Sequence, residues 1–182
     1  MIDDKNKKLL LDIARKSIIS KLNNEKFELK NIPSSLKEKR GVFVTLEKNN
    51  ELRGCIGYIQ PIKSIIDSVK ENAVNAAFKD TRFPPLTEDE LNDIKIEISI
   101  LSLPEKLEFK DSDELLEKLN SDMGVILKRG FSSSTFLPQV WEQLPDKKDF
   151  LSHLSVKAGL PFDAWKDEDI EIEVYYADKF GE

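Results

Sequence analysis

The chain has 182 residues, of which 40% are hydrophobic and 34% charged, and its net charge is −6. This length is enough for one substantial core or for two small lobes that share an interface. Lysines alternate with acidic residues from end to end, whereas nucleic-acid-binding proteins usually show a basic surplus or stripe, so we expect no nucleic-acid ligand. No apolar run could span a bilayer and no apolar leader follows Met1-Ile2-Asp3-Asp4, which predicts a cytoplasmic protein without membrane attachment.

Cysteine and histidine each occur once, as Cys55 and His153. One cysteine excludes an internal disulfide, and together the two residues are too few for a structural zinc site. Gly54 and Gly57 do not open a helix as a phosphate-binding loop requires. Composition leaves a carboxylate-only magnesium site open, but no acidic cluster has recognisable ligand spacing. We therefore predict no metal and no cofactor bound by this chain.

The first half of the chain predicts a helix, a hairpin and a second helix. Apolar residues spaced by three and four indicate a helix over residues 7–22. Alternating apolar residues indicate strands over 41–47 and 51–59, joined by a turn at Lys48-Asn49-Asn50. Pro61 suits the first turn of the next helix. The expected buried stripe of that helix is Ile62, Ile65, Ile66, Val69, Ala73, Ala76 and Ala77.

The second half begins with a segment, 80–86, whose paired prolines exclude a helix. Thr87 and Glu90 form a capping box that opens a short helix. Further elements are expected at 94–100 (strand), 111–119 (helix), 123–128 and 131–137 (hairpin), 148–158 (helix) and 170–175 (strand). Hairpins separated by helices predict an α+β fold with a largely antiparallel sheet and flanking helices.

The stretch Leu52-Arg53-Gly54-Cys55-Ile56-Gly57 contains the most reactive candidate group. Residues two apart in a strand face the same way, so Arg53 and Cys55 are expected on one face. A guanidinium near a thiol favours the thiolate, which makes Cys55 and Arg53 candidate catalytic residues. The alternative is structural: a lone cysteine in a strand is often a small buried hydrophobe, and glycines in strands often mark bulges or close packing.

Four segments together resemble the AMMECR-type domain, in the order in which that family has them. They are residues 52–57, 80–86, Leu137-Pro138-Gln139-Val140, and Lys157-Ala158-Gly159-Leu160-Pro161 closing on Ala164-Trp165. The resemblance covers nearly the whole chain and implies one domain over residues 5–180, built from a larger and a smaller lobe. It also implies that the segment at 52–57 lies near the junction of the lobes.

The resemblance implies no established activity, but it implies partners. Such domains occur beside, or fused to, a Memo-type dioxygenase-like domain and a radical SAM protein. One departure concerns Met123, which stands before Gly124 where the family commonly has a polar residue such as His or Asp. A mechanism that needs a histidine base at that position is therefore in doubt.

Four further residues are candidates for substrate binding. Arg82, with Asp80 beside it, could bind a carboxylate or phosphate, although an Asp80–Arg82 ion pair or a contact with a helix end is the structural alternative. Ser133 could donate to a ligand, and Gln139 follows a proline on a segment expected to connect the lobes. His153 is expected on a helix flank outside any catalytic site, and Trp141 in the core.

Two functions follow from these residues. The first is an enzyme or enzyme component with Cys55, Arg53 and Arg82 lining a cleft between the lobes. The second is a non-catalytic adaptor that binds another protein. The ligand is a small molecule or a protein, and the exposure of the Cys55 thiol distinguishes the two hypotheses.

Overall fold

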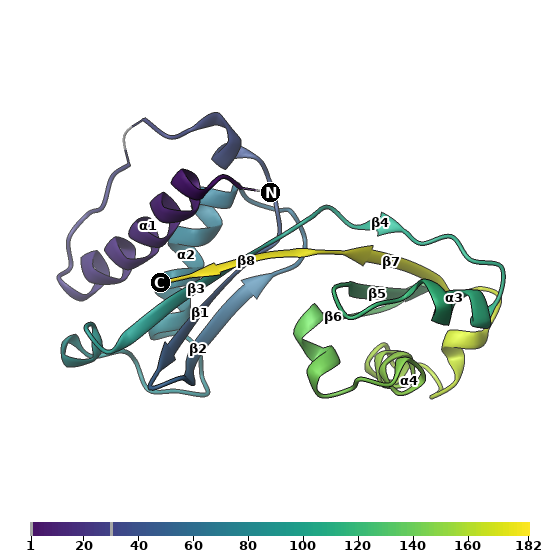
Figure 1. Cartoon of the computed structure of the whole chain (residues 1–182). Helices are drawn as coiled ribbons and strands as arrows, with labels where there is room; N and C mark the ends of the chain where they lie inside the picture. The colour runs from purple at the N-terminus through teal and green to yellow at the C-terminus, as the bar shows by residue number, and fades with distance from the viewer. Residues whose placement is uncertain (1, 30) are drawn as a thin grey trace. The chain divides into compact units, whose positions relative to one another are not determined.

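The computed structural model describes residues 2–29 and 31–182, which form two compact units. The first unit runs up to Ser102 and is completed by Asp178–Glu182, and the second unit, Leu103–Ala177, is inserted between those two parts. Each unit has its own four-stranded sheet and its own hydrophobic core (Figure 1). The structure therefore confirms the α+β prediction, with two antiparallel sheets where one was expected.

The first unit packs two long helices on one face of a sheet whose strand order is β2-β1-β3-β8. Alternate residues of β1 and β3 point into the core beneath the helices and are fully buried, as the alternating sequence predicted. In chain order its elements are α1 (Asp4–Leu22), η1 (Ser34–Lys37), β1 (Val42–Lys48), β2 (Glu51–Tyr58), α2 (Ile65–Phe78), η2 (Glu88–Glu90), β3 (Ile94–Leu101) and β8 (Ala177–Gly181).

The hairpin of β1 and β2 turns through Asn49 and Asn50, which both have positive φ (55° and 61°). Asparagine tolerates this conformation, and a two-residue turn of this kind matches the twist of the paired strands. The register then shifts by one residue between Leu46 and Glu47, because Leu46 pairs with Gly54 while Glu47 pairs with Leu52. Arg53 is therefore the extra residue of a β-bulge.

The second unit has a sheet of order β4-β7-β5-β6, and its core centres on an aromatic stack. The rings of Trp141 and Phe150 lie parallel with centroids 3.7 Å apart. The indole of Trp141 donates to the carbonyl of Met123. Its elements are β4 (Glu105–Lys106), α3 (Ser112–Lys118), β5 (Gly124–Arg129), β6 (Ser132–Phe136), η3 (Pro138–Glu142), α4 (Lys147–Lys157), η4 (Ala164–Lys166) and β7 (Glu171–Tyr175).

Two sequence predictions in the first unit need correction. The helix expected from Pro61 begins at Ile65, because the side chain of Ser64 accepts the Asp67 N–H and caps it there. Ile62 consequently lies outside the helix and is 59% exposed. The strand β8 was not predicted at all, since Ala-Asp-Lys-Phe-Gly shows no apolar alternation.

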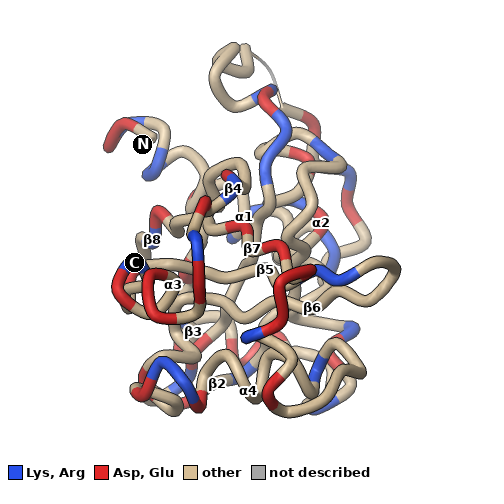
Figure 2. Tube along the Cα trace, turned by 90° about the vertical axis from the view of Figure 1, so that its right-hand side faces the viewer, with Lys and Arg blue, Asp and Glu red and all other residues tan. Residues whose placement is uncertain are grey.

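The distribution of charged residues along the chain and the hydropathy of the described helices agree with what the sequence predicts. Basic and acidic residues are interleaved along the trace in Figure 2, and no long basic stretch occurs in the described chain. None of the described helices is both long and apolar enough to cross a membrane.

Candidate functional site

The thiol of Cys55 lies on the sheet face opposite the helices, and the bulge puts it there. A regular hairpin through Asn49-Asn50 would pair Cys55 with Val44, a core residue. With Arg53 as an extra residue, Cys55 instead pairs with Thr45. Thr45 and Cys55 are both half-buried, and the Thr45 hydroxyl donates to the Cys55 sulfur at 3.2 Å.

Strand β2 is an edge of its sheet, and two side chains bond to the outward-facing backbone of Cys55. The Asp80 carboxylate accepts the Cys55 N–H at 2.9 Å, and the Arg82 guanidinium donates to the Cys55 carbonyl at 3.3 Å. Asp80 and Arg82 are themselves paired at 2.7 Å. We call these two residues the β2 cap, because together they replace the donor and the acceptor of a neighbouring strand.

The two members of the β2 cap differ strongly in exposure. The Asp80 side chain is 4% exposed and the Arg82 side chain 55%. Hydrogen bonds from Arg82 hold the pKa of the Asp80 carboxyl well below its usual range. The pKa of Arg82 is raised, chiefly by the bond to Asp80 and in smaller part by electrostatic interaction with Cys55. The site therefore combines a buried carboxylate, an exposed cation and a thiol within reach of that cation's field.

Arg53 lies in a separate ion-pair network. Its guanidinium donates to both oxygens of Glu90, at 3.0 and 2.9 Å, and to the Pro84 carbonyl. Lys48 also donates to Glu90. Hydrogen bonding from Arg53 is the main cause that lowers the pKa of Glu90 to about 2. Arg53 is 8% exposed, and its Nη1 nitrogen is buried without a partner in the described chain.

The expectation that Arg53 and Cys55 share one face was wrong. The bulge interrupts the alternation at Arg53, so that Leu52, not Arg53, shares the face of Cys55. Arg53 and Arg82 do approach one aromatic ring, that of Phe83, with Cζ atoms 5.9 and 5.5 Å from its centroid. The catalytic role predicted for Arg53 stays a prediction, and Arg82 is the arginine whose guanidinium donates to the Cys55 carbonyl.

Both glycines that flank Cys55 are explained by packing. A Cβ atom on Gly54 would meet the Ala76 carbonyl oxygen of α2 at 2.2 Å. A Cβ on Gly57 would meet the Phe43 ring at 2.3 Å. Neither glycine is therefore needed to admit a ligand, in agreement with the structural alternative for this motif.

Ser133 and Gln139, the other two predicted binding residues, belong to the second unit and are exposed. The neighbouring Ser134 is buried and donates to the Leu154 carbonyl. His153 is exposed on α4, and Trp141 is buried in the core, as predicted for each. The structure thus brings Cys55, Asp80 and Arg82 together in the first unit, and the roles predicted for Ser133 and Gln139 stay predictions.

Sequence reasoning missed three residues of this site: Thr45, Glu90 and Phe83. Glu90 was noticed only as a helix-capping residue, a role that it also has. Both arginine side chains approach the Phe83 ring, and only its place after Arg82 could have drawn attention to it. Thr45 could not be found by counting from the turn, because the bulge changes the register.

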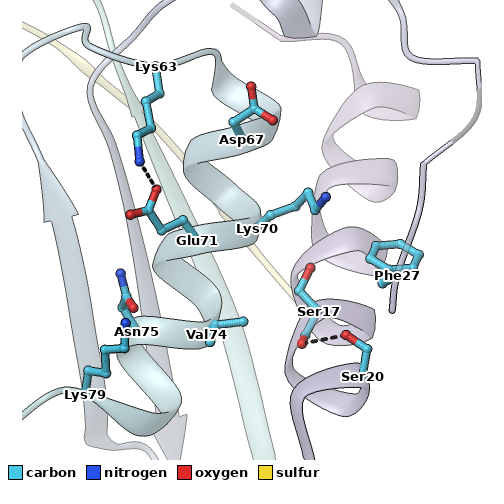
Figure 3. Close-up of a pocket in the computed structure, with 10 residues that line it drawn as sticks. All are labelled: Ser17, Ser20, Phe27, Lys63, Asp67, Lys70, Glu71, Val74, Asn75 and Lys79. Carbon is cyan, nitrogen blue, oxygen red and sulfur yellow. Dashed lines mark hydrogen bonds and ion pairs between the residues drawn. The ribbon is translucent and has the colours of Figure 1, made fainter. Parts of the chain in front are cut away.

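Two hollows in the described chain lie away from Cys55. A groove of about 700 Å³ runs between α1 and α2 (Figure 3), and there Lys63 is paired with Glu71 and the Ser20 hydroxyl donates to the Ser17 carbonyl. A hollow of about 800 Å³ in the second unit is lined by 106–112 and 165–172. No group of three or more possible metal ligands occurs among the residues that the structure describes.

Known proteins are similar to this chain over most of its length. A model of the AMMECR1 family matches residues 11–180. Protein MK0488 of Methanopyrus kandleri is 46% identical over 179 residues, which cover 95% of this chain and 86% of that relative. Protein NEQ441 of Nanoarchaeum equitans is 42% identical over 180 residues, or 95% and 98% of the two chains. The crystal structure of the uncharacterized protein PH0010 from Pyrococcus horikoshii matches with a TM-score of 0.84 at 36% identity, covering 100% of this chain and 93% of that one.

Proposed function

The chain belongs to the AMMECR1 family, and we propose that it is an enzyme or enzyme component in which Cys55 supplies a nucleophile and Arg82 contacts an anionic substrate. The observation that carries this proposal is the placement of a half-buried thiol and an exposed guanidinium at one residue of an edge strand. No other thiol exists in the chain, so any thiol chemistry belongs to Cys55.

Two polar neighbours, Thr45 and Arg82, contact Cys55. The Thr45 hydroxyl donates to the sulfur, and hydrogen bonding to an anion stabilises it. Arg82 contributes positive charge and is anchored by the buried Asp80, so its position is fixed before a substrate arrives. In this proposal Arg53 and Glu90 are positioning residues: they hold the bulge that turns Cys55 away from the core.

The proposal is tested by the rate at which iodoacetamide alkylates the folded protein at pH 7, followed by intact mass. We expect Cys55 to react faster than it does in the same chain unfolded in urea, because the folded state supplies Thr45 and Arg82. Cys55→Ser should give no labelled product and is the control for the reagent. If the folded protein reacts more slowly than the unfolded chain, the proposal that Cys55 is a nucleophile is contradicted.

A non-catalytic adaptor is the second candidate, and the packing of the two glycines favours it. A side chain at Gly54 or Gly57 would clash with Ala76 or Phe43, so packing alone explains both glycines of the motif without a catalytic role. The family resemblance suggests a radical SAM or Memo-type protein as the partner. An adaptor should retain such a partner in a pull-down when Cys55 is replaced by serine, whereas an enzyme should lose its activity with that partner.

A further inference from the structure

Beyond the β2 cap, a second residue of β2 has a backbone N–H and C=O that face the outer edge of the sheet. The N–H and C=O of Cys55 point away from β1, because Asp80 and Arg82 bond to them. Hydrogen-bonding direction alternates with a period of two along an antiparallel strand, so the N–H and C=O of Gly57 point to the same outer side. Gly57 is half-buried, and in the described chain no hydrogen bond reaches it from that side.

We propose that an extended peptide with a free C-terminal carboxylate binds along this edge, antiparallel to β2, with its carboxylate on Arg82 and its backbone paired with Gly57. The inference deepens the proposed function and rests on the role given there to Arg82. Strand addition of this kind obtains affinity from main-chain hydrogen bonds. It also fixes the direction of the peptide, since the carboxylate end lies at Cys55.

The β2 cap explains why the peptide should end where it does. Asp80 and Arg82 already occupy the positions of a partner-strand residue at Cys55, so an added strand can run only from Gly57 up to the cap. The exposed member of the cap is the cation, and the carboxylate of Asp80 is buried. A guanidinium offers a planar fork of donors that matches a carboxylate.

Asp80 accepts hydrogen bonds from only two of the three nitrogens of the Arg82 guanidinium. Its Nε and Nη2 nitrogens donate to the Asp80 oxygens, at 2.9 and 2.7 Å. Within the described residues, Nη1 has no hydrogen-bond acceptor. An incoming carboxylate at Nη1 would therefore add a charge-assisted hydrogen bond without displacing Asp80.

The test is a titration of the ¹⁵N-labelled full chain carrying Cys55→Ser, which separates peptide binding from thiol reactivity. The probe is an acetylated hexapeptide of alternating threonine and valine with a free carboxylate. Two matched peptides serve as controls, one amidated at the C-terminus and one N-methylated at the residue that would donate to Gly57. We expect saturable shifts of the Gly57 amide resonance, and binding about tenfold weaker for each control peptide.

Arg82→Gln should remove the preference for the free acid, and Arg129→Gln, in the second unit, should leave that preference intact. Equal binding of the free acid and the amide would overturn the assignment of Arg82. If the Gly57 amide resonance does not shift at millimolar peptide, the β2 edge is not the binding site for the peptide. A dimer whose Gly57 amide is protected from exchange without peptide would make a second copy of the chain the occupant, and would refute the peptide.

Discussion

Each unit has an edge strand whose backbone is bonded by a charged side chain, β2 in the first and β6 in the second. On β2, Asp80 and Arg82 satisfy both the N–H and the C=O of Cys55. On β6, Lys157 alone donates to the Thr135 carbonyl at 2.9 Å. Both devices protect an edge against unwanted pairing. Only the first adds a buried carboxylate and a nearby thiol, so chemistry is expected at β2 and not at β6.

The largest expected effect concerns how tightly β2 is packed. Gly54→Ala places a Cβ 2.2 Å from the Ala76 carbonyl oxygen, where backbone blocks any relief. We expect a loss of about 3 kcal/mol in the free energy of unfolding, measured by urea denaturation. In the hairpin that leads into β6, Gly130 has open space around it and only a positive φ, so Gly130→Ala should lose about 1 kcal/mol. Equal losses would show that β2 is no more constrained than β6.

The second effect compares one arginine from each unit. Arg53 is buried on Glu90, whereas Arg129 pairs with Asp167 and Asp169 with a third of its side chain exposed. Arg53→Ala leaves a largely buried carboxylate with Lys48 as its remaining ion-pair partner among the described residues, and should destabilise the protein by about 2–3 kcal/mol. Arg129→Ala should cost less than about 1 kcal/mol. Thermal unfolding of both variants checks the contrast, and the reverse order contradicts it.

The third effect is a pH dependence located in the first unit. The pKa of Glu90 falls from 4.5 to about 2 on folding, so its stabilisation is complete above pH 4.5 and is lost as the pH falls toward 2. Asp80, whose pKa is also lowered, acts in the same direction. Glu90→Gln should remove about 1–2 kcal/mol of this acid sensitivity, after allowance for solvent screening. A variant whose unfolding free energy has the wild-type slope between those pH values would exclude Glu90 as its source.

The smallest effect concerns the contact of Lys157 with β6. Lys157→Met removes one exposed donor to the Thr135 carbonyl, and water can replace it. We expect a change below about 0.5 kcal/mol in the free energy of unfolding. A loss as large as that of Arg53→Ala would mean that the two edges depend equally on their charges.

Much of the fold could be predicted from the sequence because its local signals agree with its packing. The turn at Asn49-Asn50, the alternation of β3 and the capping box of Thr87 and Glu90 all have short-range causes. The strand β8 could not be predicted, because it is held in place by contacts with residues that are distant in the sequence. Asp178, for example, pairs with Lys7.

The candidate site was predicted in composition but not in geometry. Cys55, Asp80 and Arg82 were all identified, and the alternative ion pair between Asp80 and Arg82 is present. Only the expectation that Arg53 and Cys55 share a face was wrong, because the extra residue in the bulge breaks the two-residue alternation between them. Gly54 was the available signal, since glycines in strands mark bulges, but it could not say which residue was extra.

The central claim is that Arg82, and not Arg53, is the positive charge that serves the thiol. Its most direct test is the rate of iodoacetamide alkylation at pH 7 for Arg82→Gln and Arg53→Gln, each shown to be folded by near-ultraviolet circular dichroism. We expect a severalfold slower reaction for Arg82→Gln and a rate close to wild type for the folded fraction of Arg53→Gln. A slower reaction for Arg53→Gln with an unchanged rate for Arg82→Gln would contradict the claim.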